Sequence, residues 1–109
     1  PENRRVENRL PGADCNPYLA ITATLACGLL GIIEGVEPTE QIKGSAYKKG
    51  NTLPSHMFDA IKKFKNSKPL QEILGEQFVR ALVSIKEAEY KAYNAVISSW
   101  ERENLLLNV

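Results

Sequence analysis

The sequence predicts a mainly α-helical chain that begins with one β-strand. Three observations favour this fold class. Residues 5–10 alternate strictly in character, apolar residues recur at helical spacing over much of the later chain, and turn-forming residues separate these segments. Of the 109 residues, 43% are hydrophobic and 25% are charged. That composition is typical of a globular domain, or of a piece of a larger one.

The charge balance and the cysteines exclude several classes of protein. There are 14 Lys and Arg against 13 Asp and Glu, a net charge of +1, which is too low for a dedicated nucleic-acid binder or a polybasic membrane anchor. Cys15 and Cys27 are too few for a disulfide scaffold, so we expect reduced, buried cysteines and a cytoplasmic location. The chain starts at Pro1 without a signal-peptide pattern, as expected of a segment from within a longer protein.

Residues 4–10 are predicted to form the strand, because charged and uncharged side chains alternate from Arg5 to Leu10. The alternation places Arg5, Glu7 and Arg9 on one face of the strand and the intervening residues on the other. Residues 11–14, Pro-Gly-Ala-Asp, then end the strand with turn chemistry.

The charged face of this strand has two interpretations. Three charges of alternating sign are typical of a solvated strand edge that discourages aggregation. Alternatively, the Glu7 carboxylate is a hard oxygen ligand suited to Mg²⁺ or Mn²⁺. The guanidiniums of Arg5 and Arg9 would then suit anionic oxygens, such as those of a phosphate or a carboxylate substrate. The pattern alone leaves both interpretations open.

Four helices are predicted, over residues 17–33, 56–65, 69–74 and 76–97, with a long irregular connection over residues 35–54. The last helix is the longest. Its core face is predicted to carry an apolar stripe, namely Phe78, Leu82, Ile85, Ala92 and Val96.

The first of these helices is unusual because residues 15–33 contain no charged side chain. Asn16 is suited to cap the helix, and Pro17 would occupy the first helical position, where its missing N–H costs nothing. The uncharged length falls within the range of a membrane span, but polar residues and glycines interrupt it. A buried globular helix is therefore the favoured interpretation, and such a helix needs cover from neighbouring structure.

Other candidate sites carry little signal. His56 is the one histidine, lacks partners at metal-ligand spacing, and is predicted to be a surface or half-buried residue. Gly28 and Gly31 lie within a predicted helix and match no nucleotide-binding fingerprint. The charged face of residues 4–10 is therefore the candidate site.

Residues 4–20 resemble the signature near the end of the glutamine synthetase catalytic domain, in which Arg-x-Glu-x-Arg precedes a proline turn and then Ala/Cys-Asn-Pro-Tyr-Leu-Ala. Here the segment reads Arg4-Arg5-Val6-Glu7-Asn8-Arg9-Leu10-Pro11-Gly12-Ala13-Asp14-Cys15-Asn16-Pro17-Tyr18-Leu19-Ala20. Further similar positions are Gly28 to Glu34, Glu37-Pro38, Leu53-Pro54, Leu74-Gly75-Glu76 and Trp100-Glu101-Arg102. Residues 1–109 thus resemble the C-terminal portion of such a catalytic domain.

The resemblance implies an α+β parent domain that follows an N-terminal β-grasp domain, in a homo-oligomer of stacked rings. It implies an ATP-dependent ligase that joins glutamate to ammonia or an amine through γ-glutamyl phosphate, with Mg²⁺ or Mn²⁺ bound. Carried onto matching positions, it implies that Glu7 ligates the metal and that Arg9 holds the transferring phosphate and the glutamate. Arg5 would contact the ATP phosphates. Most other metal ligands would lie upstream, so the isolated chain is expected to be inactive.

The resemblance leaves the amine substrate open. The turn over residues 12–15 and the ending over residues 105–107 look like those of γ-glutamylpolyamine (putrescine) synthetases, which stand beside glutamine synthetase proper as an equal alternative. Tyr47 lies near the tyrosine that bacterial enzymes adenylylate, but Lys48 and Lys49 replace the acidic surroundings, so we expect Tyr47 to stay unmodified. A non-catalytic helical interaction module is the alternative from another class.

Overall fold

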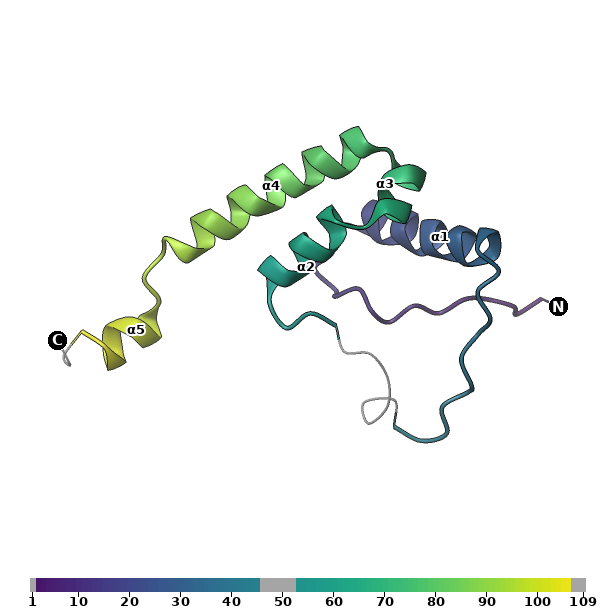
Figure 1. The fold of residues 1–109 in the computed structure, drawn as a ribbon. Helices are drawn as coiled ribbons and strands as arrows, with labels where there is room; N and C mark the ends of the chain where they lie inside the picture. Colours follow the sequence, from purple (N-terminus) through teal and green to yellow (C-terminus); the bar gives the residue numbers. More distant parts are fainter. Residues whose placement is uncertain (1, 46–52, 107–109) are drawn as a thin grey trace. The chain divides into compact units, whose positions relative to one another are not determined.

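A computed structural model describes residues 2–45 and 53–106 (Figure 1). Tyr47 and Leu107 lie outside the described residues. The described part is mainly helical and contains α1 (Pro17–Ile33), α2 (Met57–Lys65), α3 (Lys68–Leu74), α4 (Glu76–Asn94) and α5 (Ser99–Asn104). The chain divides into two compact units, Pro1–Gly44 and Ser45–Val109.

The first unit consists of a non-helical segment followed by α1. The Asn16 side chain caps α1, because its Oδ1 accepts hydrogen bonds from the backbone N–H groups of Tyr18 (3.0 Å) and Leu19 (3.3 Å). The helix ends in a Schellman motif, in which Val36 N–H donates to the carbonyl of Gly31 at 2.9 Å. Gly35 adopts a φ of 61° there, a conformation that favours glycine. The helix coincides with the predicted range 17–33.

Residues 4–10 form neither helix nor strand, so the predicted strand is not confirmed. The reason is that a strand exists only when its backbone pairs with a second strand. The described residues supply no such partner, because their ordered elements are all helices. Alternation in sequence therefore predicts how side chains divide between two sides, but it does not supply the second strand that pairing needs.

In the second unit, α2 and α3 pack against α4 (Figure 1). The buried core consists of Ile61 from α2 with Val79 and Val83 from α4. Three partly buried side chains surround it, namely Phe64, Leu74 and Tyr90. Gly75 joins α3 to α4 with a φ of 87°, which permits the sharp change of direction between the two helices.

The predicted core stripe of α4 is wrong by about one position. Val79 and Val83 are buried, at 2% and 4% exposure, whereas the predicted stripe residues Ile85 and Val96 are 55% and 68% exposed. Two adjacent faces of this helix carry apolar residues at helical spacing, so the sequence pattern fits either face. Contact with α2 and α3 determines which of the two is buried. The helix also ends at Asn94, three residues before the predicted end.

The last helix, α5, was not expected from the periodic pattern. It begins with a capping box: Ser98 Oγ accepts the Glu101 N–H at 3.1 Å, and Glu101 Oε2 accepts the Ser98 N–H at 2.8 Å. Two helix starts differ from the prediction by one residue. The helix α2 begins at Met57, one residue after the predicted start, and α3 begins at Lys68, one residue before the predicted start. Among the described residues, no helix combines the length and apolarity needed to cross a membrane.

Candidate functional site

The candidate site lies on the segment that precedes α1. Arg9 Nε donates to Glu7 Oε1 at 2.5 Å, and the two side chains are 85% and 56% exposed. The structure therefore brings together two of the three residues that the sequence singled out. Arg5 is exposed, and within the described ranges it forms no ion pair.

Asn8 attaches this segment to α1. Its Nδ2 donates to Thr24 Oγ1 at 2.9 Å, and its Oδ1 accepts the Leu10 N–H at 3.1 Å. Thr24 Oγ1 in turn donates to the Ala20 carbonyl at 2.8 Å. Asn8 thus contacts the helix, whereas its neighbours Glu7 and Arg9 form an ion pair with each other and are exposed to solvent. Sequence reasoning placed Asn8 on the uncharged side but missed this contact, for which a residue pattern holds no signal.

The pair can offer an anion-binding group and a carboxylate at once. The Arg9 guanidinium has five N–H donors, and its Nε donor serves Glu7. Among the described residues its Nη donors have no partner, so they can serve anionic oxygens, which guanidiniums bind in bidentate fashion. The second oxygen of Glu7 is available as a hard ligand for a divalent cation.

Glu7 fits a metal only as one ligand of several. Within residues 2–45 and 53–106, no group of three or more His, Cys, Asp or Glu is arranged to hold a metal ion. Since Mg²⁺ takes about six oxygen ligands, a site that includes Glu7 would need carboxylate or water ligands from beyond these residues. The donor chemistry is compatible with such a site, and the described residues do not complete one.

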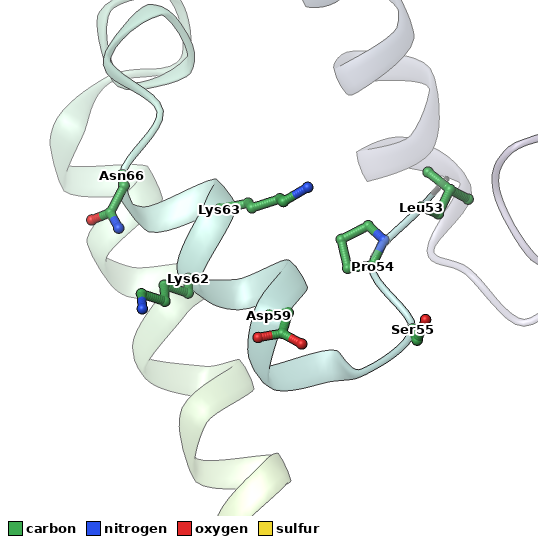
Figure 2. A pocket seen from close by; sticks show the side chains of 7 residues that line it. All are labelled: Leu53, Pro54, Ser55, Asp59, Lys62, Lys63 and Asn66. Atoms are coloured by element: carbon green, nitrogen blue, oxygen red, sulfur yellow. The ribbon is translucent and has the colours of Figure 1, made fainter. Parts of the chain in front are cut away.

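A second candidate is an open depression of about 640 Å³ beside α2, which sequence reasoning did not foresee. Its lining includes Leu53, Pro54, Ser55, Asp59, Lys62, Lys63 and Asn66. Figure 2 shows that Lys62 and Lys63 leave the helix in different directions and do not converge on one point. A site that selects a ligand needs convergent polar groups, so this depression carries no assignable chemistry.

The remaining sequence candidates are on the surface. His56 is exposed at the start of α2, which confirms the surface interpretation. Cys15 and Cys27 are both free and exposed, so the prediction that they are buried is wrong for this chain. Cys27 lies on α1, of which Ala26 is the one buried residue. Cys27 thus shares the exposure of a helix that has little cover, and Cys15 lies in the exposed turn before that helix.

Comparison with known proteins identifies the family. The sequence model of the family "glutamine synthetase, catalytic domain" matches residues 1–105. The chain is 33% identical over 111 residues to a glutamine synthetase of Halobacterium salinarum, a match that covers 94% of this chain and 24% of that protein. It is 39% identical over 101 residues to a glutamate–isopropylamine ligase of Pseudomonas sp., covering 89% of this chain and 22% of that protein.

A third relative is a γ-glutamylethanolamide synthetase of Streptomyces coelicolor, 35% identical over 98 residues, which cover 89% of this chain and 21% of that protein. The chain therefore spans about a quarter of the length of the curated relatives that it matches. Because the family model extends over nearly every residue, from the Glu7–Arg9 segment to α5, the chain belongs to the glutamine synthetase family and lies within its catalytic domain.

Proposed function

We propose that this chain is the C-terminal portion of the catalytic domain of an ATP-dependent ligase that joins glutamate to ammonia or an amine. The observation that carries the proposal is the exposed Glu7–Arg9 ion pair within a segment that the family model covers. Relatives named as glutamine synthetases and as glutamate–amine ligases support it.

The reaction needs activation because a carboxylate oxygen is a poor leaving group. The glutamate side-chain carboxylate would attack the terminal phosphorus of ATP and form a new P–O bond. The P–O bond between the terminal phosphorus and ADP would break, and ADP would leave with its electron pair. The amine lone pair would then attack the acyl carbon of γ-glutamyl phosphate. The C–O bond breaks, phosphate leaves with its electron pair, and the nitrogen loses a proton to give the amide.

The residues of this chain would hold the charged groups in that sequence. Arg9 would bind the transferring phosphate and the glutamate carboxylate through its Nη donors, since its Nε is committed to Glu7. Arg5 would contact the ATP phosphates. Glu7 would be one ligand of a divalent cation, which when bound supplies positive charge to the phosphate oxygens. The Glu7 carboxylate would also fix the plane of the Arg9 guanidinium.

The assembled enzyme would surround this segment with other structure. We propose that the rest of the catalytic domain and further subunits of a homo-oligomer cover α1, whose apolar residues are largely exposed here. The two free cysteines support a reducing, cytoplasmic setting.

The substrate class can be tested with the full-length protein. We expect glutamate-dependent phosphate release from ATP in the presence of ammonia or of one amine, with isopropylamine and putrescine as the amines tested. Aspartate, one methylene shorter than glutamate, is the matched control and should support little release. A protein that releases no phosphate with glutamate and any of these three nitrogen donors would contradict the proposal.

The glutamate–amine alternative stands as an equal second candidate. Relatives named as glutamate–amine ligases are 39% and 35% identical to this chain, and relatives named as glutamine synthetases are 32% to 37% identical, so the two ranges overlap. In the same assay, the ratio of kcat/KM for isopropylamine or putrescine to that for ammonia decides between the two. A ratio well above one would establish an amine ligase, and a ratio well below one a glutamine synthetase.

A further inference from the structure

We propose that Asn8 and Thr24 are positioning residues, which orient Glu7 and Arg9 by attaching their segment to α1. The inference rests on the proposed function, in which Glu7 ligates a divalent cation. It assigns a role to the hydrogen bond between Asn8 Nδ2 and Thr24 Oγ1, which joins residues 16 positions apart at 2.9 Å.

The hydrogen bonds around Thr24 have a fixed direction. The Thr24 hydroxyl proton is donated to the Ala20 carbonyl at 2.8 Å, so the Oγ1 lone pairs remain to accept a hydrogen bond. Asn8 must therefore present its amino group to Thr24, which turns its carbonyl oxygen toward the Leu10 N–H at 3.1 Å. Each of these polar atoms has one role, and the Asn8 amide can satisfy both contacts in only one orientation.

This orientation determines where the neighbouring side chains point. Residues 4–10 run as a non-helical, extended segment (Figure 1), and side chains of an extended chain alternate between two sides. With Asn8 held against α1, Glu7 and Arg9 are directed away from the helix, where they pair with each other. Rotation of the segment about its long axis would move the Glu7 and Arg9 side chains toward α1.

The helix is a suitable anchor because both of its ends are fixed. Asn16 caps the start, and the Schellman motif at Gly35 closes the end. Thr24 lies near the middle of α1 and is partly buried. A weak contact at that point can therefore set the position of a segment that has no ordered backbone pairing of its own among the described residues.

The test measures Mn²⁺ binding to the full-length protein by electron paramagnetic resonance, without turnover. We expect Glu7→Gln to abolish Mn²⁺ binding at this site. Thr24→Val and Asn8→Leu should each lower the Mn²⁺ affinity of the same site by about tenfold or more, the scale found when a group that orients a metal ligand is removed. The double variant should lose no more than either single one, because both remove the same contact. Thr24→Ser keeps the hydroxyl and should bind Mn²⁺ as the wild type does.

Thr22→Val is the matched control, since Thr22 is an exposed threonine of the same helix. Equal losses in Thr22→Val and Thr24→Val would overturn the proposal, because they would point to a general effect on α1. Wild-type affinity in a folded Asn8→Leu variant would also overturn it, whether or not Thr24→Val folds. If Glu7→Gln itself leaves Mn²⁺ binding unchanged, the proposed metal ligation fails together with this inference. If only Glu7→Gln weakens binding, the inference alone fails.

Discussion

Arg9 and Glu7 form an ion pair whose Nε–Oε1 distance is 2.5 Å, although both side chains are more than half exposed. Exposed ion pairs contribute only about 0–1 kcal/mol to stability. The pair therefore does little to hold the fold. It places a guanidinium, which suits anionic oxygens, beside a carboxylate, which suits a divalent cation, on an accessible surface.

The stability of the second unit should depend on its small core rather than on exposed apolar residues. Val79→Ala removes two methyl-sized groups from a side chain that is 2% exposed, and should lower the free energy of unfolding by about 2 kcal/mol. Ile85→Ala, in the same helix but 55% exposed, is the control and should change it by about 0.5 kcal/mol or less. Denaturant titration followed by circular dichroism measures both. Equal losses would show that Val79 is not a core residue.

The exposed face of α1 should cause the isolated chain to associate. Ile21, Leu25 and Ile32 are 60%, 68% and 80% exposed, and contiguous apolar surface of this kind drives contact between molecules. Leu25→Lys should shift the chain toward the monomer in sedimentation velocity, whereas the charge-matched control Thr22→Lys should shift it less. A wild-type chain that remains monomeric at high concentration would contradict this expectation.

The isolated 109-residue chain should be inactive as a ligase. It contributes one candidate metal carboxylate and two candidate arginines, and the described residues contain no complete metal site. Assays of γ-glutamyl transfer with ATP and Mn²⁺ should therefore give only the background rate of buffer. Transfer by the purified chain above the rate of its own Arg9→Ala variant would show that the site is complete without further protein.

The α5 capping box should be visible in the titration of Glu101. The hydrogen bond from the Ser98 backbone N–H, followed by the Ser98 side chain, lowers the pKa of Glu101 below its usual value. Because the folded-state pKa is lowered, the contribution to α5 stability is present above the unfolded pKa and is lost as pH falls through the folded one. Nuclear magnetic resonance titration of Glu101 should show this lowered pKa, and Ser98→Ala should raise it partway. An ordinary pKa in the wild-type chain would show that the box does not form.

The local signals in the sequence predicted local structure well. Asn16 with Pro17 identified the start of α1, and Gly75 identified the boundary between α3 and α4, because caps and positive φ angles depend on a few neighbouring residues. The Ser98–Glu101 capping box is also a local signal, and it could have identified α5.

Features that depend on distant contacts could not be predicted in the same way. The strand over residues 4–10 needs a partner strand, and the buried face of α4 is selected by α2 and α3. At the candidate site, the alternation of Glu7, Asn8 and Arg9 correctly separated the charged side chains from Asn8. The bond from Asn8 to Thr24 joins two segments through a turn whose geometry no residue pattern specifies.

The substitution Glu7→Gln in the full-length protein tests the central claim most directly, because it keeps the size of the side chain and removes its charge. At saturating Mg²⁺, glutamate and amine, we expect turnover to fall by about a hundredfold or more. The thermal unfolding midpoint of the metal-free protein should hardly change, since Glu7 is an exposed residue. Near-normal turnover with unchanged stability would contradict the account and return Glu7 to the role of a solvated surface charge.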